Sequence, residues 1–244
     1  MTVSIGGATI AGGITIGDYI PTVSSGLVLS LDAGNPASYP GTGTTWFDVS
    51  GNGRNGTLVN GPTYTSAGAS GYFTLNGTNY FNTVTATTLG INLVSTPFTL
   101  SIWFRTTASS EYYFFDNYNG VTPDISLRID GGKLETYLSA SSGGAFDAVQ
   151  FGSGYNNNAW TNFAMVWDGV NTIKAYANGV SLGSNTQAGL TGNFESGAAF
   201  QIGSRPVSGG GFPGDISVMM VYNTALSLSQ VSQNFNALRG RYGI

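Results

Sequence analysis

Hydrophobic and polar residues alternate in short runs over most of the chain after residue 26, and clusters of Gly, Asn and Ser separate the runs. In segment 98–105, Phe98, Leu100, Ile102 and Phe104 alternate with Thr, Ser, Trp and Arg, the pattern of a strand with one buried face. Similar runs lie at 27–31, 72–75, 112–115, 125–129, 134–138, 163–167, 173–177 and 216–222. This spacing predicts an all-β, antiparallel domain of roughly ten or more strands.

Two short motifs predict particular elements. Asn178-Gly179 lies between two β-patterned runs, and this dipeptide favours a two-residue hairpin turn because both central residues need positive φ. Ser227 and Gln230 have the spacing of a capping box, and apolar residues then recur on one helical face up to Leu238. We expect this helix to lie across a sheet edge or to close one end of the core. The absence of helical periods between the strands disfavours a parallel α/β sheet.

The first 23 residues differ from the rest, because they combine many Gly with isolated Ile residues and are too short to fold alone. One interpretation is an extra edge strand or a frayed terminus. The other is an extended arm, residues 1–23, that docks on another subunit through Ile5, Ile10, Ile14 and Ile16, since unpaired β-strand backbone invites strand addition. We favour the arm, followed by one domain over residues 24–244.

Composition removes several classes of function. The chain of 244 residues has no His and no Cys, which excludes a Ser-His-Asp triad, a Cys-His dyad, thiolate zinc sites and disulfides. Its net charge is -4 without any basic run, so we expect no nucleic-acid partner. No segment approaches the length of apolar sequence that a membrane span requires, so we expect no membrane insertion.

Five segments carry a resemblance to a known family. They are LVLSLDAGNPASYPGTGTTWFDVSGNGRNG, FTLNGTNYF, FTLSIWFRTT, WTNFAMVWDGVNTIKAYANGVSLG and FPGDISVMMVYNTALSLSQVSQNFNALRG. In this order, over residues 26–242, they resemble the laminin-G-like, concanavalin A-like jelly roll. The DAGN and SGNG turns and the NFNALRGRY ending are most similar to versions in virion proteins of tailed bacteriophages. The resemblance implies two antiparallel sheets packed face to face, with a core that includes Trp103, Phe104, Phe163, Trp167, Met220 and Tyr222.

From the arm, the missing catalytic groups and this resemblance, we expect a non-enzymatic phage structural protein located in the virion. It would be a capsid decoration or head-fibre subunit, held to other virion proteins by its arm, with the jelly roll projecting outward. The sequence leaves open whether it sits on capsid, neck or tail, and whether it forms a homo-oligomer.

The alternative function is a glycan-binding, lectin-like module of a tail fibre or surface adhesin. Two loops, 111–119 and 155–160, combine aromatic residues with amides, the mixture that sugar sites on jelly rolls use. Tyr118 and Tyr155 are the aromatics that we expect to face solvent, with Asn119 and Asn157 as hydrogen-bonding partners for a host-surface glycan.

The sequence gives weaker support to three other kinds of site: a hydrolase site, a calcium site and a phosphate site. Glucanases of this fold use closely spaced carboxylates on one strand, but no two acids here are two residues apart. Asp130 with Glu135, or Glu111 with Asp116, could still meet across a turn, and a hydrolase would depend on Asp130 or Glu135. The resemblance implies a structural calcium near Asp32 and Asp48, yet Ser217 stands where the family often has an acid. We therefore expect both to form turns, with no resident metal or cofactor. The Gly-rich loop 204–214 precedes no helix and does not predict a phosphate site.

Overall fold

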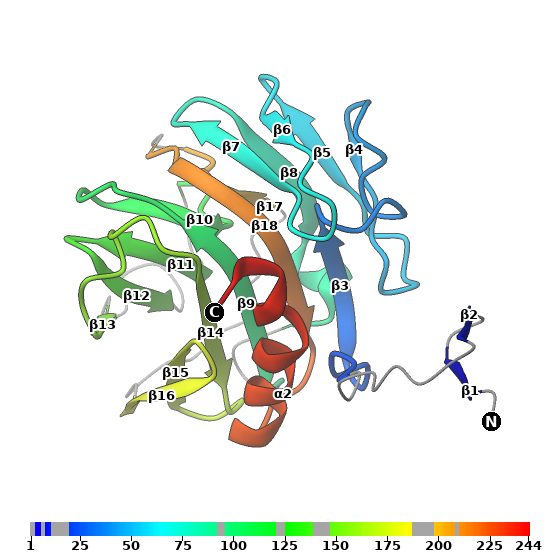
Figure 1. The fold of residues 1–244 in the computed structure, drawn as a ribbon. Coiled ribbons are helices and arrows are strands. Elements are labelled where there is room, and N and C mark those ends of the chain that lie inside the picture. The colour runs from blue at the N-terminus through cyan, green and yellow to red at the C-terminus, as the bar shows by residue number, and fades with distance from the viewer. Residues whose placement is uncertain are drawn as a thin grey trace.

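The structure is a computed structural model that describes residues 20–91, 96–120, 125–138, 147–186, 198–207 and 210–244, together with two short N-terminal strands (Figure 1). These strands, β1 (Val3–Ile5) and β2 (Ala8–Ile10), pair with each other antiparallel. The described helices are α1 (Ala86–Leu89), α2 (Leu228–Leu238) and the 3-10 helix η1 (Arg239–Tyr242). None of them is long and apolar enough to cross a membrane.

The remaining strands form two antiparallel sheets. Sheet I has the order β13 (Asp147–Phe151), β12 (Lys133–Leu138), β11 (Ile125–Asp130), β10 (Tyr112–Asp116), β17 (Ala199–Ile202), β8 (Tyr80–Thr85), β5 (Gly56–Val59) and β4 (Thr45–Trp46). Sheet II has the order β16 (Val180–Thr186), β15 (Thr172–Ala177), β14 (Thr161–Trp167), β9 (Phe98–Arg105), β18 (Pro213–Tyr222), β7 (Tyr72–Asn76) and β6 (Thr63–Thr65). A further strand, β3 (Leu27–Asp32), pairs with the second half of β18. The predicted antiparallel sandwich is confirmed.

The main core lies between the two sheets. Phe81, Phe115 and Phe200 come from sheet I, Phe73 and Trp167 come from sheet II, and all are 0% exposed. Burying one large apolar side chain of this kind contributes about 1.5–3 kcal/mol. Every one of the aromatic and Met residues predicted for the core is buried.

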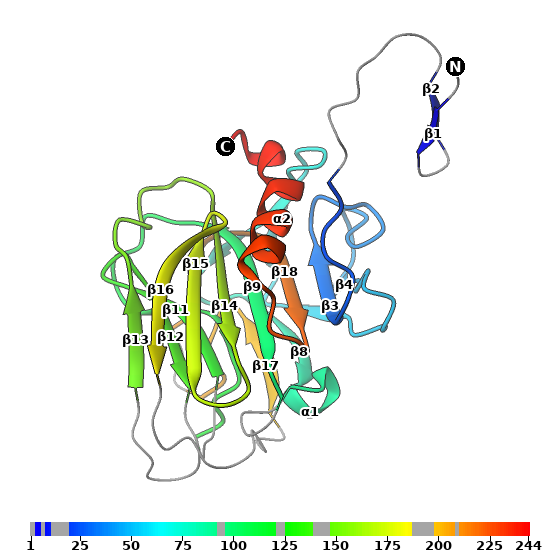
Figure 2. The ribbon, with the colours of Figure 1, turned by 90° about the horizontal axis from the view of Figure 1, so that it is seen from below.

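A second apolar layer covers the other face of sheet II. Helix α2 lies across β9 and β18 (Figures 1 and 2), and Val231 and Leu238 of α2 pack against Trp103, Val218 and Met220 of these strands. The polar side of β9 is therefore buried as well, which corrects the prediction of a half-buried strand at 98–105. The helix covers a sheet face, and the expectation that it lies at an edge or closes one end of the core is wrong.

Both local predictions are confirmed. β15 and β16 pair through the Asn178-Gly179 turn, where φ is 50° and 73°. Ser227 caps α2, because its side chain accepts the Gln230 N–H while the Gln230 side chain accepts the Ser227 N–H. The short elements α1 and η1 were not predicted, since a single helical turn leaves too little periodicity to detect.

Candidate functional site

A row of polar side chains crosses the outer face of sheet I. Tyr113 of β10 lies opposite Arg128 of β11, and Arg128 lies opposite Glu135 of β12. Their neighbours Ile129 and Leu134 belong to the main core. Because successive side chains on a strand point to opposite faces, the row of Tyr113, Arg128 and Glu135 lies on the face turned away from the core.

Arg128 is the centre of this row. Its Nε donates to Glu135, and its Nη1 lies 3.1 Å from a carboxylate oxygen of Glu111. Burial lowers the pKa of Arg128, but hydrogen bonding and attraction from Glu135, with attraction from Glu111, raise it overall. The same Nη1 lies 3.4 Å from the Tyr113 hydroxyl. Charged groups are costly to desolvate unless they are paired in this way.

Arg205 adds a second cation from the loop that follows β17. Its guanidinium carbon lies 4.0 Å from the ring centroid of Tyr118 and 5.1 Å from that of Tyr113. Its Nη1 donates to the Tyr113 hydroxyl at 3.0 Å. Contact with two aromatic rings and a hydrogen bond to one of them fix the orientation of this guanidinium.

Asp116, at the end of β10, lies beneath this guanidinium. It is 0% exposed, and its Oδ1 lies 4.0 Å from Arg205 Nε. Burial raises the pKa of Asp116 to about 6, against the opposing effects of the hydrogen bonds from Ser126 and from the Tyr118 N–H. The Tyr118 N–H bond, 2.7 Å long, also turns the chain so that the Tyr118 ring reaches Arg205. We call the set Tyr113, Asp116, Tyr118, Arg128 and Arg205 the arginine–tyrosine face.

The predicted glycan residues from the two loops do not come together. Tyr118 and the exposed Asn119 follow β10, at the end where the Ile125 N–H donates to Asn117. The Tyr155 N–H instead donates to the carbonyl of Gly132, which lies in the turn after β11. β11 separates the two ends, and its six residues span roughly 17 Å at the usual rise per residue.

Tyr155 and Asn157 both have structural contacts. Tyr155 packs against the main core, and burial raises its pKa. The Asn157 side chain accepts the Ala159 N–H at 2.9 Å and so forms its own turn. Of the four predicted glycan residues, the structure thus places Tyr118 in the arginine–tyrosine face and Asn119 beside it.

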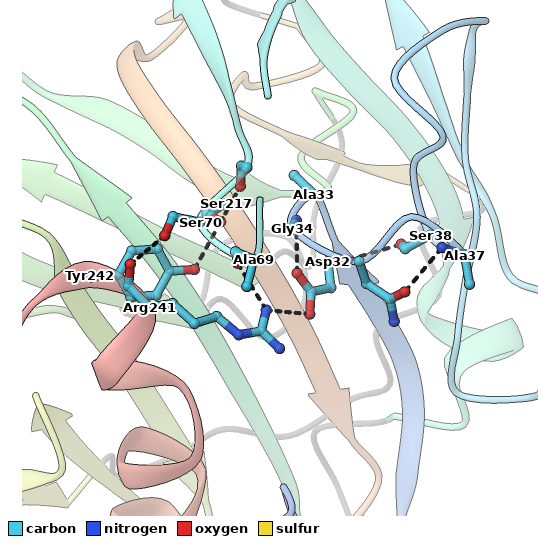
Figure 3. A network of polar contacts seen from close by, with 12 residues as sticks. Asp32, Ala33, Gly34, Ala37, Ser38, Ala69, Ser70, Ser217, Arg241 and Tyr242 are labelled. Atoms are coloured by element: carbon cyan, nitrogen blue, oxygen red, sulfur yellow. Dashed lines mark hydrogen bonds and ion pairs between the residues drawn. The ribbon is translucent and has the colours of Figure 1, made fainter. Parts of the chain in front are cut away.

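Both calcium candidates are engaged by protein donors, and Figure 3 shows those of Asp32. Asp32 accepts the Gly34 N–H at 2.9 Å, and its other oxygen lies 2.7 Å from Arg241 Nη1. Asp48 accepts the N–H groups of Ser30, Ser50 and Arg54 at 2.9–3.0 Å. Both carboxylates therefore serve turns and an ion pair. Within the described ranges, no three His, Cys, Asp or Glu residues gather where they could hold a metal ion.

The contacts of Arg241 belong to a network that ties the C-terminal 3-10 helix to sheet II (Figure 3). The Tyr242 hydroxyl donates to Ser217 at 2.8 Å, and the Ser217 hydroxyl donates to the Gly71 carbonyl at 2.6 Å. Ser217 is 0% exposed. Ser217, which stands where the family often has an acid, therefore carries a buried hydroxyl that links η1 to the chain just before β7.

The predicted arm lies largely outside the described residues, Ile14 and Ile16 among them. Ile5 and Ile10 belong to β1 and β2. The Val23 N–H donates to Asn234 of α2 at 2.8 Å, and Gln233 of α2 donates to the Pro21 carbonyl, also at 2.8 Å. Residues 21 and 23 thus make hydrogen bonds to α2, and the boundary after residue 23 stays a prediction.

Sequence reasoning missed Arg128 and Arg205. Arg205 lies in the Gly-rich loop that was considered only for phosphate, and its partners Asp116 and Tyr118 are more than 80 residues away in the chain. Composition was the signal that could have identified them, because Lys and Arg together number only 8 in the chain. Two arginines adjoining aromatic-rich strands were therefore unusual enough to single out.

The chain matches one family model over more than half of its length. The model of the concanavalin A-like lectin/glucanases superfamily matches residues 68–232. The chain belongs to this superfamily. Its sandwich is accordingly a concanavalin A-like fold. No curated protein sequence matches the chain.

Several solved structures of similar fold are described as binding domains. The binding domain of Paraclostridial mosquitocidal protein 1 has a TM-score of 0.68 at 18% identity, covering 87% of this chain and 52% of that one. The binding domain of botulinum neurotoxin DC, solved in complex with SialylT, has a TM-score of 0.66 at 14% identity, covering 88% and 52%. This chain thus spans about half of those toxin domains. Domain 4 of AbnA, an arabinanase from Geobacillus stearothermophilus solved with arabinotriose, has a TM-score of 0.62 at 20% identity, covering 85% and 97%.

Proposed function

We propose that this protein is a non-enzymatic, lectin-like module that binds a glycan on the arginine–tyrosine face of sheet I. The observation that carries the proposal is the packing of Arg205 between the rings of Tyr118 and Tyr113, above the buried carboxyl group of Asp116. The site offers the partly exposed ring of Tyr118 for the C–H face of a sugar, beside the partly exposed guanidinium of Arg205, which can donate charge-assisted hydrogen bonds.

The network supports binding because it orders these groups before a ligand arrives. Tyr118 and Arg205 are partly exposed, whereas Asp116 and Tyr113 beneath them are buried. A ligand that meets side chains already fixed by packing and hydrogen bonds loses less conformational freedom on binding. The arabinotriose and SialylT complexes of two similar domains add support at the level of the fold.

The carboxyl groups favour binding over hydrolysis. Glu135, a member of the hydrolase pair considered from the sequence, is held by Arg128, and Asp130 lies opposite Lys133 at the hairpin turn. A glycosidase needs two carboxyl groups that flank the scissile bond, one of them free to donate a proton. An ion-paired Glu135 is poorly suited to that role.

A glycan array with the full chain tests the proposal. We expect Tyr118→Ala and Arg205→Lys each to weaken binding of any array ligand by roughly tenfold, because each removes one side of the stacked pair, and tenfold corresponds to about 1.4 kcal/mol. Arg239→Lys is the matched control, since Arg239 is exposed beyond α2. Unchanged binding in both test variants, or an array without any bound glycan, would contradict the proposal.

We also propose that the N-terminal segment anchors the domain in a virion. Support comes from its apolar Gly-rich sequence and from the pairing of β1 with β2, which gives the segment β-structure of its own. Deleting residues 1–19 should leave the domain folded, since the residues bound to α2 remain, and should abolish incorporation into particles. Retained incorporation of that variant would refute the anchoring role.

A further inference from the structure

A cavity of about 540 Å³ opens at the opposite edge of the sandwich from β13. It lies between the loop that joins β3 to β4 and the loop that joins β6 to β7, and its aromatic residues are Tyr39 and Tyr64. In sheet I, β17, β8 and β5 separate β4 from β10. The cavity is therefore distinct from the arginine–tyrosine face.

The aromatic wall of this cavity is rigid. The rings of Tyr39 and Tyr64 meet edge to face at 4.8 Å, and both also contact the buried ring of Phe73, at 4.7 and 5.3 Å. The Tyr39 hydroxyl donates to the Gly43 carbonyl at 3.0 Å, and the Tyr64 hydroxyl donates to the Ala33 carbonyl at 3.1 Å. Each tyrosine is thus held at both its ring and its hydroxyl.

The two loops that form the walls are also held together closely. A Cβ at Gly34 would lie 2.0 Å from the Ala69 carbonyl oxygen, and a Cβ at Gly71 would lie 2.6 Å from the Ala33 carbonyl oxygen. Only glycine permits such an approach of two backbones. The cavity is therefore a preformed feature, as ligand sites usually are.

The chemistry of the lining selects an uncharged ligand. The residues that line the cavity are Gly, Pro, Ala, Tyr and Ser, without a charged side chain among them. Because both Tyr hydroxyl hydrogens are committed to carbonyls, a ligand could use these hydroxyls as acceptors but not as donors. The half-buried ring of Tyr64 and the exposed Pro36 and Pro40 offer apolar surface, while the buried Tyr39 supports Tyr64 from behind. A neutral sugar ring combines an apolar C–H face with several O–H donors.

We infer that the Tyr39–Tyr64 cavity is a second binding site, for a neutral sugar unit of one or two rings. Its volume lies within the range of roughly 300–1,000 Å³ that is usual for small-molecule sites. The inference extends the proposed glycan binding to a second site, but it rests on different residues. One site on the face of sheet I and a second at the edge of the sandwich would allow the protein to engage two branches or two chains at once, with a gain in avidity.

The test is a nuclear magnetic resonance titration of the full chain with arabinotriose, maltotriose and chitotriose as neutral probes. We expect at least one of them to shift the amide signals of Gly41 and Ser66. In Ser66→Trp, which places an indole at the cavity mouth, binding at this site should weaken by roughly tenfold or more. Ser184→Trp, at an exposed position of β16, is the matched control and should bind as the wild type does.

The proposals for the two sites can be tested independently of each other. Tyr118→Ala should leave the Gly41 and Ser66 shifts unchanged, and Ser66→Trp should leave binding at the arginine–tyrosine face unchanged. Absence of these shifts with all three probes would overturn the inference even if the array result holds. A response to a proline-rich peptide in place of the sugars would also overturn it, because the cavity would then be a peptide groove.

Discussion

The buried carboxyl group of Asp116 should make the stability of the domain depend on pH in a defined direction. Burial raises its pKa from the ordinary value of 3.8 to about 6. Between these two values the folded protein holds a proton on Asp116 that the unfolded chain has released. The free energy of unfolding contributed by this group is therefore largest below about pH 4 and is lost as pH rises to about 6.

The two pKa values give the magnitude. They differ by a little over two pH units, and each unit corresponds to about 1.4 kcal/mol, so the loss is about 3 kcal/mol. Asp116→Asn removes the titration while an amide oxygen still accepts the Tyr118 N–H. Because the unfolded chain is already more than half ionised at pH 4, we expect the stability of the wild type, relative to Asp116→Asn, to fall by about 2.5 kcal/mol between pH 4 and pH 7.

Urea unfolding of both proteins at pH 4, 5, 6 and 7 measures this difference. The comparison with Asp116→Asn cancels the other titrating groups, and Asp130→Asn, at a half-buried position on β11, controls for loss of a carboxyl on the same sheet. A difference that stays constant over this range would refute the reasoning, since Asp116 would then be ionised throughout. A difference that grows in favour of the wild type with rising pH would show that Arg205 outweighs burial.

Three other changes have expected outcomes. Trp103→Ala should lower the free energy of unfolding by about 3–5 kcal/mol in chemical denaturation, because Trp103 is 0% exposed beneath α2; a loss below 1 kcal/mol would mean that the helix contributes little. Gly34→Ala should lower the melting temperature and distort the Tyr39–Tyr64 cavity, since the new Cβ would meet the Ala69 carbonyl at 2.0 Å; an unchanged melting temperature would contradict this packing. EDTA should leave the melting temperature unchanged, because Asp32 and Asp48 are engaged by protein donors; a clear decrease on chelation would indicate a bound cation.

The local elements followed directly from sequence. The Asn178-Gly179 turn and the Ser227 cap each depend on two or three adjacent residues whose backbone conformations and side-chain hydrogen bonds are set by short-range sterics. The strand runs and the class of fold could also be predicted, because a buried face repeats every second residue. These features are determined by residues that are close together in the sequence, so the sequence alone is enough to predict them.

Which faces are covered depended on tertiary packing. The alternation at 98–105 predicts one buried face, yet α2 arrives from more than 120 residues later and buries the other. A pattern within one strand contains no record of what packs on it from elsewhere. The same reason explains why the direction of α2 across sheet II could not be predicted.

The candidate sites show this division most clearly. Sequence alone determined that the protein is an all-β domain without His or Cys chemistry, and it drew attention to Tyr118. Only the tertiary structure decided that Tyr118 packs on Arg205 above Asp116 and that Tyr155 lies at the far end of β11. It also decided that Tyr39, from a loop, and Tyr64, from β6, lie together at one cavity. Strand register and sheet order bring these residues together or keep them apart, and both depend on pairings between segments distant in the chain.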